Sequence, residues 1–397
     1  MTSEDVARVQ DAAPLPMPWL LIWATCLATF TITASGSTRT PFLMDMSRDL
    51  DVSLAMVANL FGITSIAWGL ASFFAGIGSD VMGRRPFLVG APLALTGAMV
   101  GLAEGGSFLS VAAWATLGGG FCGLFTGVSM AEIAGKVSDR QRGRALGWVM
   151  AGQSMTLLVG VPLASWIGAS IGWRGITYCV AAMAFLSALA MFSTTTAMPQ
   201  QVQHSAVSRQ PLLRAALTTS VLRLLGSVIA ERICFGLAAV YYATFMLQTY
   251  SLSLEVLAIP LMIFAGGNVL GTIVGGQLGD RLRNRALTFA VALVASGGVA
   301  ILLFSWPAGA PVSTALGFGY MFANAIARPS LMAALSNVPS EVRGTVMGLN
   351  STAASAGWLA AAALGGWILS TIGFSGFGPL AGALAILGAV LALLGRS

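Results

Sequence analysis

Long apolar runs constrain this chain more than any other feature. Runs of about 18 residues or more, the length that suggests a membrane-spanning helix, follow one another over nearly the whole sequence. Only 9% of the 397 residues are charged, whereas soluble proteins carry roughly 25%. The runs are too long and too rich in Gly and Ala for the alternating strands of an outer-membrane barrel. The sequence therefore predicts an all-α membrane protein.

The polar segments between the runs divide the chain into twelve predicted transmembrane helices. These are 19–41, 54–78, 86–103, 108–134, 145–169, 174–194, 222–248, 254–278, 286–305, 309–336, 344–370 and 375–394. The longest polar interval separates the sixth helix from the seventh, which gives two bundles of six. We therefore predict a cytoplasmic N-terminal tail over 1–18, an N-terminal bundle over 19–194, a cytoplasmic central loop over 195–221 and a C-terminal bundle over 222–397.

The basic residues predict the orientation, because Lys and Arg near the end of a span resist translocation. With the N-terminus inside, thirteen of them fall in predicted inner loops and only Arg48 and Arg174 in outer loops. The acidic N-terminal segment does not have the features of a cleavable signal peptide. We predict a multi-pass protein of the cytoplasmic (inner) membrane with both termini in the cytoplasm. This distribution explains the net charge of +6 without a nucleic-acid partner.

The two halves repeat each other at an offset of 200–201 residues. The matching segments are DLDVSLAMVA at 49–58 with TYSLSLEVLA at 249–258, GIGSD at 76–80 with GQLGD at 276–280, RGRALG at 142–147 with RGTVMG at 343–348, and WIGASIGWRG at 166–175 with WILSTIGFSG at 367–376. Six spans per half is an even number, so the halves have the same orientation in the membrane. Transporters built from such parallel repeats bind substrate near the midplane and alternate access between the two sides.

The loop after the second predicted helix resembles the best-known motif of the major facilitator superfamily, Gly-x-x-x-Asp-Arg-x-Gly-Arg-Arg/Lys. The matching residues are Gly76, Asp80, Gly83, Arg84 and Arg85, with Val81 at the family's basic position, and in the second copy Gly276, Asp280, Arg281 and Arg285. The resemblance extends over essentially the whole chain and implies a fold of two pseudo-symmetric six-helix bundles. It also implies a gating contact of Asp80 with nearby arginines and a facing helix on the inner side. We expect Gly76 to let two helices approach closely; plain anchoring by Arg84 and Arg85 is the alternative.

The fifth predicted helix resembles the signature of the superfamily's drug-efflux antiporters. Gly147, Gly152, Gly160 and Pro162 place small residues and a kink on this helix. The eleventh helix carries alanines where Gly160 and Pro162 stand. The resemblance implies antiport; ordinary packing of helices through glycine is the alternative.

Charged residues at membrane depth are candidates for function, because burying them is costly. Five fall on the helices that usually line the cavity in this superfamily: Arg39, Glu132, Glu231, Arg232 and Arg328. Tyr241 and Tyr242 are candidates for stacking on a planar solute.

Each candidate also has a structural interpretation. Arg39 would extend to the outer interface, Glu132 would be an interfacial charge near Lys136, and Glu231 with Arg328 would form a buried structural pair. The tyrosines would be packing residues.

The sequence predicts no catalytic residue, metal site or cofactor. Its four cysteines lie far apart in apolar runs, its single histidine, His204, lies in the predicted central loop, and no phosphate-binding loop is present. We therefore predict a non-enzymatic, monomeric secondary transporter whose partners are a small-molecule substrate, protons and the lipid bilayer. Proton-coupled efflux of a small organic solute by alternating access is the leading hypothesis. Two alternatives stay open: uptake of an organic anion bound by Arg39, Arg232 and Arg328, and a membrane sensor that has the fold without turnover.

Overall fold

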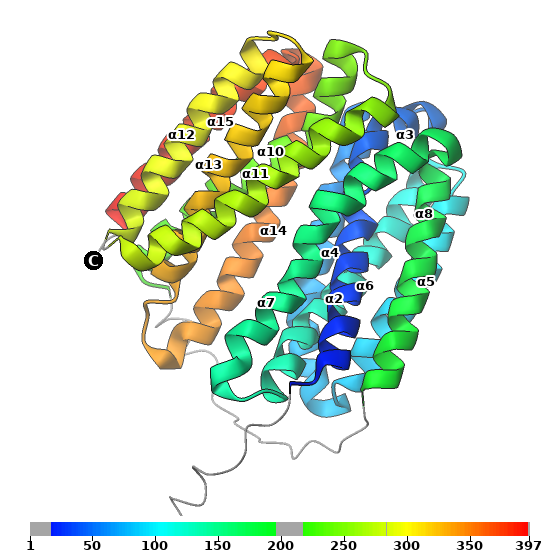
Figure 1. Cartoon of the computed structure of the whole chain (residues 1–397), viewed down its shortest axis with the longest axis vertical. Helices are drawn as coiled ribbons and strands as arrows, with labels where there is room; N and C mark the ends of the chain where they lie inside the picture. The colour runs from blue at the N-terminus through cyan, green and yellow to red at the C-terminus, as the bar shows by residue number, and fades with distance from the viewer. Residues whose placement is uncertain (1–16, 196–216, 283, 396–397) are drawn as a thin grey trace, which may run out of the picture.

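The structure is a computed structural model that describes residues 17–195, 217–282 and 284–395. In this part the chain is helical and contains no β-strand. Most of the predicted N-terminal tail and of the central loop, with His204, lies outside the described residues. Figure 1 shows the helices of the N-terminal half (blue to green) beside those of the C-terminal half (yellow-green to red).

The helices of the N-terminal half follow the predicted spans closely. They are α2 (Trp19–Ser37), η1 (Thr40–Phe42), α3 (Leu43–Asp49), α4 (Leu54–Met82), α5 (Arg85–Glu104), α6 (Phe108–Gly135), α7 (Asp139–Met155), η2 (Thr156–Gly160) and α8 (Val161–Thr194). The first predicted span, 19–41, is corrected: α2 ends at Ser37 and the chain continues through the short helices η1 and α3. Pro41 in η1 has no backbone N–H to donate to a continuing helix, which favours this break.

The C-terminal half has a corresponding order of helices. They are α10 (Thr219–Tyr250), α11 (Leu254–Arg281), α12 (Arg285–Ser305), α13 (Ala310–Leu335), α14 (Ser340–Thr371), η3 (Phe374–Gly376) and α15 (Phe377–Leu394). Both α10 and α14 extend beyond the apolar runs 222–248 and 344–370 at each end.

Twelve spans result, as predicted. Ten helical segments of the described chain are long and apolar enough to cross a membrane. One of them, Gln141–Thr194, holds two spans, which separate at Gly172, where the backbone has φ 69° and ψ 176°. The remaining helix, α13, is not among the ten, and Asn324 and Arg328 lower its apolar character. The predicted fold class is therefore confirmed.

The backbone repeats at the same offset as the sequence. Asp51 and Ser251 both adopt left-handed conformations, with φ 51° and 50°, just before the second and eighth spans. Two residues later, the hydroxyls of Ser53 and Ser253 each accept a hydrogen bond from the backbone three residues on. A left-handed conformation is unfavourable for residues other than glycine, so the pairing of Asp51 with Ser251 reflects a shared architecture.

The halves contact each other mainly through α4 with α14 and through α8 and η2 with α11. A Cβ added to Gly366 of α14 would lie 2.9 Å from Cβ of Ala55 in α4, and one added to Gly62 would lie 2.7 Å from the Leu359 side chain. Ala55 and Gly366 lie at the ends of α4 and α14 that we predict to face outward.

The second pair of helices meets at the same end. The Ser165 hydroxyl of α8 donates to the Leu254 carbonyl at the start of α11, at 2.7 Å. We use the name outer seam for the six residues that make these contacts between the halves: Ala55, Gly62, Ser165, Leu254, Leu359 and Gly366. The ends of the two halves that we predict to face outward are therefore closed against each other in this structure.

The fifth span differs from its repeat, the eleventh. Its middle turn, η2, is a π-helix that lies directly before Pro162. Proline has no N–H to complete the α-helical ladder, and single π turns occur often at functional sites. The eleventh span, α14, carries Ala363 at the equivalent position and has no π turn.

Candidate functional site

Glu231 is the centre of a buried ion cluster. Of the carboxylates in the described helices, it alone lies more than a helical turn from either end, about three turns into α10. Its Oε1 accepts from Nη2 of Arg328 at 3.2 Å, and its Oε2 lies 3.4 Å from Nε of Arg232. The Glu231 side chain is 2% exposed, whereas those of Arg232 and Arg328 are 19% and 23% exposed. The cluster thus has one more positive than negative charge, and its cations are its more accessible part.

Aromatic rings complete this cluster. Phe235 lies one turn after Glu231, and its ring centroid is 4.7 Å from the Arg328 guanidinium carbon and 5.9 Å from that of Arg232. Trp358 of α14 packs edge-on against Phe235, with centroids 5.5 Å apart. Cations stack favourably on aromatic faces. The cluster therefore brings together a buried carboxylate, two more accessible guanidinium groups and a pair of aromatic rings.

Two further polar residues, Tyr320 and Asn324, lie on the same face of α13 as Arg328 and were not predicted from the sequence. Tyr320, Asn324 and Arg328 follow at intervals of four, so they share one helix face. The Tyr320 hydroxyl donates to the Cys234 carbonyl of α10. Asn324 is fully buried, and neither amide atom has a hydrogen-bond partner among the described residues. The spacing from Arg328 is the sequence signal that points to both.

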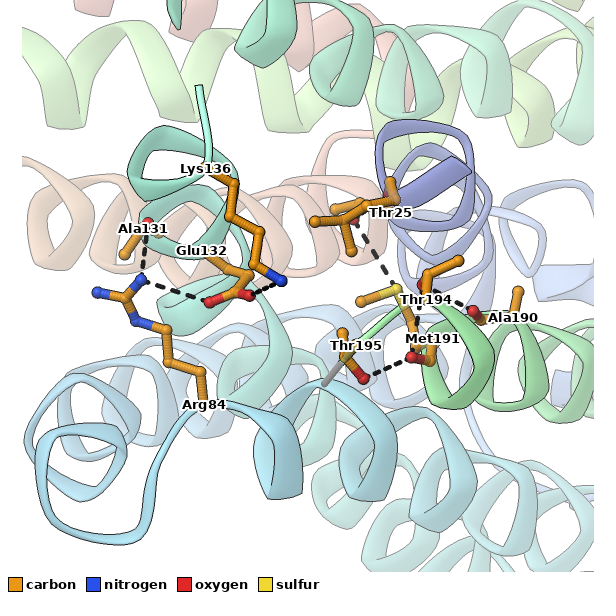
Figure 2. Close-up of polar contacts among 10 residues, drawn as sticks. Thr25, Arg84, Ala131, Glu132, Lys136, Ala190, Met191, Thr194 and Thr195 are labelled. Carbon is orange, nitrogen blue, oxygen red and sulfur yellow. Dashed lines mark hydrogen bonds and ion pairs between the residues drawn. The ribbon is translucent and has the colours of Figure 1, made fainter. Parts of the chain in front are cut away.

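Glu132 lies in a second ion cluster, near the predicted inner end of α6 (Figure 2). Its Oε2 lies 3.4 Å from Nη1 of Arg84, and its Oε1 lies 2.9 Å from Nζ of Lys136. Arg84 also donates to the Ala131 carbonyl at 3.1 Å. The Glu132 carboxylate therefore joins the loop after α4 to the end of α6, in agreement with the interpretation of Glu132 as an interfacial charge.

Arg39 is buried and does not extend to the outer interface, so that interpretation is corrected. The residue is 5% exposed, and its guanidinium carbon lies 5.3 Å from the ring centroid of Phe61 in α4. Its Nε donates to the Gly36 carbonyl at 3.4 Å. The side-chain contacts of Arg39 with Gly36 and Phe61 both lie within the N-terminal half.

Tyr241 and Tyr242 belong to the core of the C-terminal half. Both are almost completely buried. The Tyr241 hydroxyl donates to the Ala362 carbonyl at 2.8 Å, and the Tyr242 ring stacks on Phe264 with centroids 4.3 Å apart. The hypothesis that they stack on a solute is corrected for this conformation, because protein atoms already occupy their faces.

The glycines of the gating motif are not points of close helix contact in this conformation. A Cβ added to Gly76 or Gly276 would meet nothing within 4 Å, which corrects the expectation for Gly76. The close approach of α4 to α6 occurs instead at Gly123, where an added Cβ would lie 2.2 Å from the Trp68 carbonyl oxygen. Gly83 ends α4 with φ 79°, a conformation that favours glycine.

The charged residues of the motif have different surroundings in the two copies. The side chains of Asp80 and Asp280 lie outside the described part of the structure. Arg85 stacks on Phe192, with its guanidinium carbon 4.8 Å from the ring centroid. Arg285 donates to the Ala333 carbonyl at 3.5 Å, and Arg281 is exposed in the last turn of α11.

The glycines of the fifth span pack it against the first. A Cβ added to Gly152 would lie 2.3 Å from the Cys26 carbonyl oxygen, and one added to Gly160 would lie 3.0 Å from the Phe30 ring. A Cβ added to Gly147 would meet nothing within 4 Å. Close packing of α7 and η2 on α2 thus accounts for two glycines of the helix-five motif.

Comparison with known proteins agrees with this architecture. The sequence profile of the Major Facilitator Superfamily matches residues 25–361. The inner membrane transport protein YdhP of Escherichia coli O157:H7 is 28% identical over 274 residues, and the match covers 66% of each chain, just under two thirds of that relative. The chloramphenicol resistance protein of Streptomyces lividans is 25% identical over 300 residues, 74% of this chain and 72% of that protein.

Solved structures show the same fold. A bacterial homologue of the human lysosomal transporter Spinster, in an inward-facing and occupied conformation, matches with a TM-score of 0.79 and 15% identity over 96% of this chain and 97% of that chain. The twelve spans, the repeated halves and the profile match over most of the chain lead to one conclusion. The protein belongs to the Major Facilitator Superfamily.

Proposed function

We propose that the protein exports a small organic solute across the cytoplasmic membrane in exchange for protons, by alternating access between two bundles over 19–194 and 222–397. The observation that carries this proposal is the Glu231 cluster: a buried carboxylate, two more accessible arginines and the Phe235–Trp358 ring pair at one place in the C-terminal half. Both termini are proposed to face the cytoplasm, and the monomer is proposed to be the transporting unit.

Glu231 is proposed as the residue that proton and solute share. Burial in surroundings of low dielectric favours the neutral form of a carboxyl group, whereas a paired arginine favours the charged form. A solute that donates hydrogen bonds to Glu231 would compete with the proton for the same oxygens. Such mutual exclusion is what an antiporter requires. Phe235 and Trp358 would contact the ring of the solute.

The relatives support export. One is named as a chloramphenicol resistance protein and another as an inner membrane transport protein. Chloramphenicol has an aromatic ring and several hydrogen-bonding groups, so it is a suitable first probe for this chain.

The proposal is tested with the purified protein in liposomes. Chloramphenicol transport is measured with an imposed pH gradient and after its collapse. We expect the gradient to drive transport in the wild-type protein. The E231Q substitution should lower the gradient-driven rate at least tenfold. The control E132Q, which changes a carboxylate of the other half, should keep most of the rate. Equal rates with and without the gradient in the wild type would contradict proton coupling, and an absence of flux for every solute tried would favour the sensor alternative.

The arginines support a second candidate, proton-coupled uptake of an organic anion. Arg232 and Arg328 outnumber Glu231, and an excess of guanidinium groups suits a carboxylate. Uptake of benzoate that is lost in R328A, with dye efflux insensitive to the proton gradient, would favour this candidate over export.

The Arg84–Glu132–Lys136 cluster is proposed to stabilise the inner side of the N-terminal half. It fixes the motif loop to α6 through two ion pairs and one backbone hydrogen bond. Asp80 and Asp280 remain proposed gate residues on the basis of the motif.

A further inference from the structure

Arg39 is a buried cation with few polar contacts. Among the described residues, its one side-chain hydrogen bond is the 3.4 Å contact from Nε to the Gly36 carbonyl. Its Nη1 is buried without a hydrogen-bond partner, and Arg39 forms no ion pair with any carboxylate of the described residues. In contrast, Arg232 and Arg328 both lie beside Glu231.

The segments next to Arg39 contact the C-terminal half. The helix η1, which begins at the next residue, packs against α10. On the other side, the Arg39 guanidinium lies over Phe61, and the next residue, Gly62, contacts Leu359 of α14 at the outer seam. The surroundings of Arg39 therefore depend on whether the outer ends of the two halves are in contact.

This dependence has an energetic consequence. A guanidinium without a counter-ion is costly to bury, because it loses hydration and gains no opposite charge. Closure of the outer seam imposes that cost, and opening of the seam removes it. In the closed state, Nη1 is covered by protein atoms, so an anion can reach it only after the seam opens.

We propose that Arg39 is an anion-binding residue of the outer-open state, which takes a singly charged anion of halide or carboxylate type. The inference rests on the alternating access proposed above. Because such an anion binds one state and not the other, it shifts the equilibrium towards the open seam. Arg39 thus makes outer opening sensitive to anions on the outer side.

The test measures the width of the outer seam directly. Spin labels are placed at two exposed positions, D51C, three residues before α4, and T371C, the last residue of α14. The full chain also carries C26A and C179A, and distances are recorded in lipid nanodiscs. The buffer contains sodium isethionate, then sodium chloride or sodium benzoate at equal ionic strength. We expect chloride, benzoate or both to raise the ratio of open to closed populations about threefold or more. A response to only one of them identifies the anion as halide or carboxylate.

Two variants complete the test. R39Q should favour the closed seam in isethionate and show no response to either anion, whereas R39K should keep the response because it keeps the charge. The inference is overturned if the wild-type distances are the same in chloride, benzoate and isethionate, or if R39Q responds to the anions as the wild type does. If R39Q does not fold, the wild-type titration and R39K decide. If the protein exports chloramphenicol but the seam distance does not change with chloride or benzoate, only the anion site is overturned. If the seam distance changes but the pH gradient drives no transport, only the proposed export is overturned.

Discussion

The two halves of the molecule share a backbone plan but place their carboxylates differently. In each half an arginine of the motif donates to a carbonyl near the predicted inner end of the fourth or tenth span: Arg84 to Ala131, and Arg285, the counterpart of Arg85, to Ala333. The N-terminal half adds Glu132 at that end, whereas the C-terminal half has Ala333 at the equivalent position and Glu231 in the middle of α10. The comparison teaches that the repeat conserves the arrangement of helices while each half carries its own charges. We therefore expect unequal effects from matched substitutions.

The largest expected effect is the loss of the buried carboxylate. E231A leaves Arg232 and Arg328 without their counter-ion, and breaking a buried ion pair in this way costs about 3–5 kcal/mol. E132A in the N-terminal half should cost about 1 kcal/mol or less, because Arg84 and Lys136 are partly exposed there. Unfolding of each variant in detergent, titrated with SDS, measures the two losses of stability. Equal losses for the two variants would remove the distinction between the halves.

The next effect concerns close packing in the fifth span. G152A places a Cβ 2.3 Å from the Cys26 carbonyl oxygen of α2, which is too close for an ordinary contact. We expect this substitution to destabilise the protein by about 1–3 kcal/mol. The matched control G147A lies on the same helix in open space and should change stability little. The same SDS titration applies. A G147A variant as unstable as G152A would show that the motif acts through something other than contact with α2.

A double substitution sharpens the comparison between the ion clusters. E231L/R328L leaves one uncompensated cation where E231L leaves two, so the double variant should be more stable than E231L by about 1–3 kcal/mol. The corresponding pair E132L and E132L/R84L should differ by less than about 1 kcal/mol. A double-mutant cycle gives both coupling energies. A larger coupling at Glu132 would reverse the proposed ranking.

The smallest effect separates these two motif arginines, Arg84 and Arg285. R84A loses an ion pair and a carbonyl hydrogen bond, whereas R285A loses only the longer contact with Ala333. We expect R84A to cost about 0.5–1 kcal/mol more than R285A. Unfolding of the two single variants side by side measures the difference. If R285A were the more damaging, a role of the second motif copy beyond these contacts would follow.

The sequence alone determined the membrane class, the twelve spans and the repeat. These features follow from local properties, because a span needs only enough consecutive apolar residues and a repeat only a matching order of residues. Gly83, Gly172 and Gly373 lie within the predicted loops, and glycine there allows the positive φ that interrupts a helix. The sequence also identified Glu231, Arg232 and Arg328 as buried charges.

Only the tertiary structure decided which of these groups meet. It paired Glu231 with Arg328, buried Arg39 against Phe61 and gave Tyr241 and Tyr242 to the core, whereas the sequence left each with two interpretations. It also moved the close helix contact from Gly76 to Gly123 and added Tyr320 and Asn324 to the site. The physical reason is that the burial and partners of a side chain depend on residues about a hundred positions away, which come together only when the helices pack.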